Sequence, residues 1–266
     1  MIKEDVMNSE IETLVDRIHG RISGREAWRD VLEDRPGLSD EDAYRIQFAL
    51  MRRLTAGGDR VVGYKAAYTS LAVQAQRGNG GPIAGAFLQS GYLPEEEPVA
   101  IVPERRNAVE PEVAILLGAD LPGPQVTPLD VRRATALLLP AIEVAVGAPD
   151  DVKRSRQMVI ATNKTAGSII VGGPGCAPEG IDLRLEGCVL TINGKTAGSG
   201  AGAEVMGDPY NAAALIANTV LANGDVLRAG MILMTGSVTA AIPVEPDDDV
   251  RAEFTRLGSI HIRFAS

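Results

Sequence analysis

Apolar residues recur at helical spacing near the start of the chain. In "LSDEDAYRIQFALMRRL" (38–54), Ser39 is followed three positions later by Asp42, which is an N-cap signal. One helical face of this segment then carries Ala43, Ile46, Ala49, Leu50 and Leu54. The pattern predicts helices between residues 10 and 57.

After residue 58 the apolar runs become short, β-prone and broken by glycine or proline. Strands are predicted at 60–70, 99–102, 112–117, 141–147, 168–173, 226–236 and 240–244, and as a pair at 250–257 and 258–264. A hairpin is predicted at 188–200, with Asn193-Gly194 as a type I′ turn.

Two helices are predicted between the strands. One covers 127–139 and ends at Pro140, because a proline interrupts a helix. The other begins with Asp208 as its cap and Pro209 in its first turn, and ends before Gly224. The fold class is therefore α+β, with an N-terminal helical region at 1–58 and a β-rich domain at 59–266, or one continuous domain.

Composition excludes several classes of protein. The net charge is -9, and without clustered lysine and arginine we expect no nucleic-acid partner. The polar start resembles no signal, and no apolar run is long enough to span a membrane, so we expect a cytoplasmic protein without a membrane partner. The two cysteines, Cys176 and Cys188, lack metal or redox spacing. The two histidines, His19 and His261, are too few to favour Ser-His-Asp catalysis or a histidine zinc site.

Carboxylates are the strongest candidate functional groups. In "AVEPEVAILLG" (108–118), Glu110 and Glu112 are two residues apart, so on a strand they project from the same side. Pro111 between them suits a strand edge or a bulge. Glu143 lies within the apolar run "AIEVAV". Three such carboxylates would suit one hard cation, Mg²⁺ or Mn²⁺, but three solvated strand-end carboxylates remain an alternative.

Lys65 is the only cation in "VVGYKAAYTS" (61–70). Such a lysine either extends to the surface or lies near an anion. Two glycine-containing motifs favour ordinary structure. "NGKT" is better explained by the hairpin than by a phosphate-binding loop, and "GSGAGAE" (198–204) by a tight connection or a loop near a ligand than by a dinucleotide site.

Several of these segments occur in an order that resembles a known family. They are "VVGYKAAYTS", "VEPEVAILLG", "LPAIEV" and "IIVGG", followed by the stretch from "LTINGK" through "GDPYNAAALIANTVLANG" to "AAIPV", and by "LGSIHIRF". This order resembles the hydratase/decarboxylase branch of the fumarylacetoacetate hydrolase superfamily from about residue 40 to 264. The resemblance implies a mixed β-sandwich or roll core, and enzymes of aromatic catabolism.

The resemblance also implies roles for individual residues. Glu110, Glu112 and Glu143 match the family's metal ligands for Mg²⁺ or Mn²⁺, and Lys65 matches its lysine. We expect Lys65 to be catalytic, by holding an enolate or carboxylate oxygen or by protonating the product. Substrate-binding candidates are Thr235, Ser237, Ile83 and Lys164; Thr235 and Ser237 suit turn chemistry equally well.

Two local signatures resemble 4-oxalocrotonate decarboxylases more than hydratases: "GPIAGAFL" (81–88) and "GSVTAAIPV" (236–244). The hydratase aspartate would fall at Ile83. The expected function is metal-dependent decarboxylation of a 2-oxo-3-enedioate through a metal-stabilised dienolate. The alternatives are a 2-hydroxypenta-2,4-dienoate-type hydratase, a lyase for a larger biosynthetic enone acid, or a non-catalytic partner subunit of a hydratase complex.

Three departures from the family pattern bear on the substrate. Val146, Gly147 and Ala148 stand where the family has Asp-Ser-Arg. "ATNKT" (161–165) replaces "ADNAS", and Asp208 replaces a histidine. The metal chemistry would be retained while the small 2-oxo acid substrate differs. By resemblance we also expect a homo-oligomer, with a hydratase complex as a further option.

Overall fold

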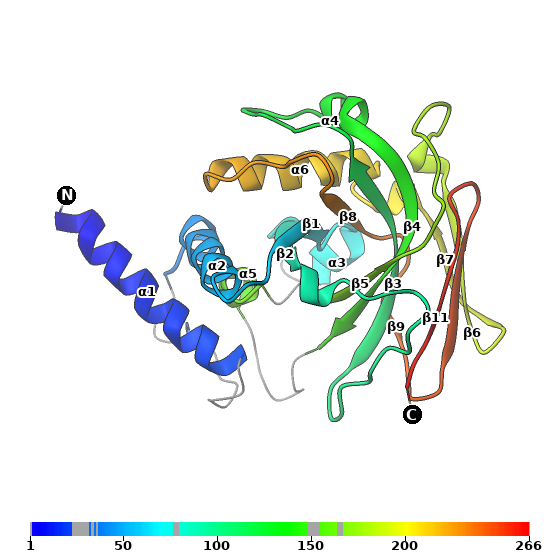
Figure 1. The fold of residues 1–266 in the computed structure, drawn as a ribbon, viewed down its shortest axis with the longest axis horizontal. Helices are drawn as coiled ribbons and strands as arrows, with labels where there is room; N and C mark the ends of the chain where they lie inside the picture. The colour runs from blue at the N-terminus through cyan, green and yellow to red at the C-terminus, as the bar shows by residue number, and fades with distance from the viewer. Residues whose placement is uncertain are drawn as a thin grey trace.

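The computed structural model describes residues 2–22, 32, 35, 37–76, 80–147, 155–163 and 167–265. Figure 1 shows that the N-terminal helices lie on one side of the molecule and most of the strands on the other. The N-terminus lies at the helical side and the C-terminus at the β-rich side. The α+β fold class is confirmed.

Two long helices form the helical side: α1 (Ile2–Ile22) and α2 (Asp40–Thr55). The side chain of Ser39 accepts a hydrogen bond from the Asp42 backbone N–H, which confirms the predicted N-cap. The apolar face of α2 is buried, including Ala43, Ile46, Ala49 and Leu50. Arg53 of α2 forms an ion pair with Glu12 of α1 across the helix pair, at 3.0 Å.

The main sheet positions the site. Its strand order is β2-β1-β8-β3-β4-β5, and β9 also pairs with β3. Strands β1 and β8 are parallel, and the other pairs are antiparallel. The strands are β1 (Val61–Ala67), β2 (Ile83–Leu88), β3 (Asn107–Leu117), β4 (Thr135–Val146), β5 (Ser168–Val171), β8 (Ile232–Ser237) and β9 (Ile242–Pro243).

A second antiparallel sheet has the order β11-β10-β6-β7 and packs against β4 of the first. Its strands are β6 (Gly187–Ile192), β7 (Lys195–Ala201), β10 (Asp249–Phe254) and β11 (Gly258–Arg263). The remaining helices are α3 (Leu71–Gln76), α4 (Pro128–Ala134), α5 (Arg156–Ala161) and α6 (Pro209–Ala222), with short 3₁₀ turns at Gln89–Gly91, Leu183–Leu185 and Gly202–Glu204.

Local turn and cap predictions are confirmed. Asn193 and Gly194 take φ values of 52° and 74° between β6 and β7, as a type I′ turn requires. The Asp208 side chain accepts a hydrogen bond from the N–H of Tyr210 and caps α6. Gly224 follows the helix with φ 80°.

Two element predictions are wrong. The helix predicted at 127–139 ends at Ala134, and β4 begins at the next residue. A capping box between Thr127 and Asp130 starts the helix, but pairing with β3 along its whole length makes the following apolar run a strand. Pro140 lies inside that strand, where its carbonyl accepts a hydrogen bond from Gly172 at 2.9 Å. Residues 99–102 form no strand; Val99 alone bridges to Phe264.

Among the described residues, none of the helices combines the length and the apolar character that a bilayer crossing requires. The division at residues 58 and 59 stays a prediction.

Candidate metal centre

Three glutamates meet where β3 and β4 pair. Glu110 lies directly opposite Glu143 in the antiparallel register, and Glu112 follows two residues later on the same side of β3. Each contributes a carboxylate oxygen, and the three oxygens lie within 4.8 Å of one another. Glu112 and Glu143 are fully buried and Glu110 is half-buried. The structure thus brings the three predicted ligands together.

The backbone around Pro111 explains this arrangement. Strand β3 is internal to the sheet, but it changes partner here: β9 pairs with Ala108 and Val109, and pairing with β8 begins at Glu112. The register shifts between Glu112 and Ala114, as expected for a bulge. A proline is tolerated at this gap, and its carbonyl accepts a hydrogen bond from Val238.

Backbone N–H groups orient two of the carboxylates. Gly167 donates to Oε1 of Glu143 at 2.9 Å, and Gly236 donates to Oε2 of Glu112 at 2.8 Å. Both positions require glycine. A Cβ at Gly167 would lie 2.1 Å from the Val144 carbonyl oxygen, and Gly236 has φ +107°.

Lys65 projects from β1 to the same cluster. Its Nζ forms an ion pair and hydrogen bond with Oε2 of Glu143, and its side chain is only 3% exposed. Burial lowers the pKa of Lys65, but the charges of Glu143, Glu110 and Glu112 raise it more, so the net shift is upward. The lysine is therefore held as a cation beside the carboxylates.

One lysine does not balance the negative charge of three carboxylates. Burial raises the pKa of Glu112 well above its ordinary value, and repulsion from Glu143 and Glu110 adds to this, although Lys65 opposes it. Burial and the charge of Glu143 likewise raise the pKa of Glu110. Among the described residues, Oε1 of Glu112 is buried and finds no hydrogen-bond partner. A converging, all-oxygen donor set with an unused buried oxygen fits a hard divalent cation.

The cluster opens into a cavity of about 690 Å³. Lys65, Glu110 and Glu112 lie on its wall, together with the turn at 68–70. Small apolar residues form much of the remaining wall: Ala72, Val73, Ala145, Val146, Ala240 and Ala241. The site therefore combines a charged end with an apolar enclosure, which is typical of a small-molecule site.

The predicted substrate-binding residues differ in their position relative to the cavity. Ser237 lines the cavity, and its hydroxyl contacts the Pro111 carbonyl at 3.4 Å. Thr235 is fully buried, donates its hydroxyl to Val113 at 2.9 Å, and is not among the lining residues. Ile83 lies in the apolar core on β2, away from the lining. Lys164 lies outside the described residues. The four assignments stay predictions.

Sequence reasoning missed the orienting N–H groups of Gly167 and Gly236 and the turn formed by Tyr68 and Thr69. Tyr68 has φ 59°, which is an uncommon backbone conformation for a tyrosine. No sequence pattern signals that conformation, because it depends on the surrounding contacts.

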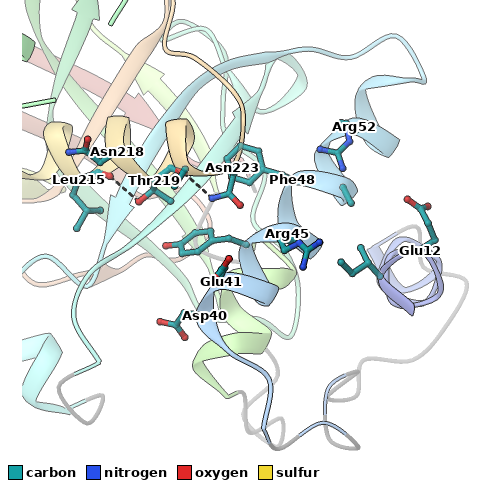
Figure 2. Close-up of a pocket in the computed structure, with 14 residues that line it drawn as sticks. Glu12, Asp40, Glu41, Arg45, Phe48, Arg52, Leu215, Asn218, Thr219 and Asn223 are labelled. Atoms are coloured by element: carbon teal, nitrogen blue, oxygen red, sulfur yellow. Dashed lines mark hydrogen bonds between the residues drawn. The ribbon is translucent and has the colours of Figure 1, made fainter. Parts of the chain in front are cut away.

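A larger cavity, of about 1240 Å³, lies between α1, α2 and α6. Figure 2 shows Leu215, Asn218 and Thr219 on one side and Arg45 and Arg52 of α2 on the other. The amide of Asn218 is already bonded to the backbone of Val126. No converging set of metal-binding groups lines this cavity in the described part of the chain, so the smaller cavity is the candidate site.

Comparison with known proteins agrees with this geometry. No protein-family model matches the chain. The chain is 34% identical over 234 residues to 4-oxalocrotonate decarboxylase of Pseudomonas putida, covering 88% of this chain and 89% of the relative. It is 32% identical over 231 residues to 2-keto-4-pentenoate hydratase of Paraburkholderia xenovorans, covering 87% and 86% respectively.

Among solved structures, 4-oxalocrotonate decarboxylase from Pseudomonas putida G7, complexed with magnesium and adipate, superposes with a TM-score of 0.87. It is 31% identical, and the match covers 97% of this chain and 98% of that one. Decarboxylases and hydratases are both lyases, so the fold and relatives define this protein as an enzyme of the lyase class. The chain belongs to the hydratase/decarboxylase branch of the fumarylacetoacetate hydrolase superfamily.

Proposed function

We propose that this enzyme is a divalent-metal-dependent decarboxylase that acts on a 2-oxo-3-enedioate such as 4-oxalocrotonate. The observation that carries the proposal is the cluster of Glu110, Glu112 and Glu143 with Lys65 on a cavity whose remaining wall includes several small apolar residues. The similar decarboxylase from Pseudomonas putida G7, which was crystallised with magnesium and the dicarboxylate adipate, supports it.

The three glutamates would hold Mg²⁺ or Mn²⁺. Both ions prefer oxygen ligands, and Oε1 of Glu112 supplies an oxygen that no donor in the described part of the chain uses. When bound, the cation would supply Lewis-acid polarisation of the carboxylate and 2-oxo oxygens at one end of the substrate.

Lys65 would act at the same end of the substrate. Because the neighbouring carboxylates hold its Nζ as an ammonium, it can hydrogen-bond an oxygen that becomes negative as the carbon–carbon bond breaks. The same proton can be delivered to the product. Glu143, which accepts from both Lys65 and Gly167, fixes the position of that ammonium group.

The opposite end of the substrate would lie against small apolar residues, including Ala145, Val146, Ala240 and Ala241. Such a surface solvates a carboxylate poorly and favours its departure as CO₂. Hydration would need a group that activates water. By the family resemblance the hydratase aspartate would fall at Ile83, which is fully buried in the core. This supports decarboxylation over hydration.

The experiment is a product analysis with 2-oxo-3-hexenedioate in H₂¹⁸O and Mg²⁺ or Mn²⁺. Decarboxylation predicts metal-dependent CO₂ release, which Glu112→Gln abolishes and Glu204→Gln retains. Glu204 is the matched control because it is an exposed glutamate on the same cavity.

Other outcomes select the alternatives. Incorporation of ¹⁸O into a 2-hydroxypenta-2,4-dienoate substrate without CO₂ release would identify a hydratase. Turnover only of longer enone acids would indicate a biosynthetic substrate. No metal uptake, together with co-purification with a hydratase, would indicate a non-catalytic partner. A homo-oligomer remains part of the proposal, and gel filtration with light scattering tests it.

A further inference from the structure

Thr69 has an unusual position on the wall of the site cavity. It is 5% exposed, yet within the described part of the chain its hydroxyl forms no hydrogen bond. Its backbone oxygen, in contrast, accepts from the backbone N–H of Met206 at 3.2 Å. Its Oγ1 is not one of the fully buried atoms that lack a partner, so this hydroxyl is reached from the cavity and is available to a molecule that binds there.

The hydroxyl lies beside the backbone that orients a metal ligand. A Cβ built on Gly236 would lie 2.4 Å from Oγ1 of Thr69, so the threonine side chain packs directly on the Gly236 backbone. The N–H of Gly236 donates to Oε2 of Glu112. A molecule bound at the glutamates would therefore present its own oxygens close to Thr69.

The turn that carries Thr69 is held in place. Tyr68 takes φ 59°, in the left-handed region, and ends strand β1. The side-chain amide of Gln74 donates to the Tyr68 carbonyl at 2.9 Å, and Met206 anchors the next carbonyl. A hydroxyl fixed in this way loses little conformational freedom when it binds a ligand.

The other candidate hydroxyls are already used. Thr235 donates to Val113 at 2.9 Å. Ser237 contacts the Pro111 carbonyl and accepts from the N–H of Thr239 at 3.3 Å. We propose that Thr69 donates its hydroxyl proton to the carboxylate of the 2-oxo acid substrate, beside the metal ligands. This assignment rests on the proposed function.

Oxalate binding in the presence of Mn²⁺ tests the assignment, because oxalate presents two adjacent oxygens as a 2-oxo carboxylate does. The variant Thr69→Val keeps the shape and removes the hydroxyl, and Thr69→Ser keeps the hydroxyl. Thr135→Val is the matched control, since that buried hydroxyl donates to the Val131 carbonyl and does not line the cavity. Isothermal titration measures the affinity for Mn²⁺ first and then the affinity of the Mn²⁺-loaded protein for oxalate. Thermal unfolding checks that each variant is folded.

The assignment predicts that Thr69→Val weakens oxalate about tenfold or more, the usual effect of losing a hydrogen bond to a charged group. Mn²⁺ affinity stays at the wild-type value, and both Thr69→Ser and Thr135→Val retain oxalate binding. Unchanged oxalate affinity in folded Thr69→Val, or equal loss in Thr69→Ser, overturns this assignment alone. Failure of the wild type to bind oxalate with Mn²⁺ bound overturns the proposed function as well.

Discussion

Replacing Glu112 by glutamine should stabilise the metal-free protein while it destroys the metal site. Glu112 is fully buried, and one of its oxygens has no hydrogen-bond partner within the ranges that the structure describes. Burial and two neighbouring glutamates raise its pKa, so its ionised form is unfavourable in the folded state. A glutamine keeps the acceptor for the Gly236 N–H and directs an NH₂ group toward the neighbouring carboxylates.

The magnitude follows from two terms. Satisfying a buried polar group and removing an unfavourable charge should raise the free energy of unfolding by about 1–2 kcal/mol. For a chain of this size, this raises Tm by about 2–8 °C. Mn²⁺ at about 100 times its Kd should stabilise the wild type by about 2.7 kcal/mol and the variant by almost nothing. The order of stability therefore reverses on adding metal.

The assay is thermal unfolding in EDTA and in excess Mn²⁺, followed by circular dichroism. Glu204→Gln removes the same charge from an exposed position and should leave both Tm values near those of the wild type. The reasoning is refuted if Glu112→Gln lowers Tm in EDTA, or if Mn²⁺ raises the Tm of the variant as much as that of the wild type.

Three further outcomes are expected. Lys65→Met removes the ammonium beside Glu143 and should lower kcat about 100-fold or more while Mn²⁺ still binds. Steady-state kinetics measures kcat and Mn²⁺ titration measures binding; an unchanged kcat would contradict the role of Lys65. Gly236→Ala places a Cβ 2.4 Å from Oγ1 of Thr69 at φ +107° and should cost more than about 1 kcal/mol in urea denaturation; wild-type stability would rule out this packing. The raised pKa of Glu112 means that, without metal, the folded state keeps a proton on this carboxyl that the unfolded state has lost. In EDTA the free energy of unfolding should therefore decrease as pH rises from about 4.3 through the folded pKa, and Mn²⁺ should oppose this trend. A free energy of unfolding that increases with pH in EDTA would contradict the assignment.

Sequence reasoning was accurate where local chemistry decides the structure. Ser39 and Asp208 cap helices, and Asn193-Gly194 forms the hairpin turn, because each acts on backbone groups only a few residues away. The run 135–139 was predicted as helix because its leucines suit either a helix or a buried strand. Pairing with β3, which is distant in sequence, decides in favour of the strand.

At the candidate site, too, local patterns predict some features and contacts between distant segments decide the others. Alternation along a strand and the family resemblance together predicted the three glutamates, and the structure places Glu110 opposite Glu143. Spacing alone left solvated carboxylates open, because it does not show burial. The donor groups of Gly167 and Gly236 and the position of Thr69 arise from contacts between distant segments. These features become visible only in the folded chain.

The most direct test of the central claim is a Mn²⁺ titration of the purified protein, followed by electron paramagnetic resonance of the free ion. The account predicts one tightly bound ion per chain in the wild type and in Glu204→Gln, and loss of that ion in Glu110→Gln, Glu112→Gln and Glu143→Gln. A wild type that binds no Mn²⁺, or glutamate variants that bind it as tightly as the wild type, would contradict the assignment of these residues as a metal centre.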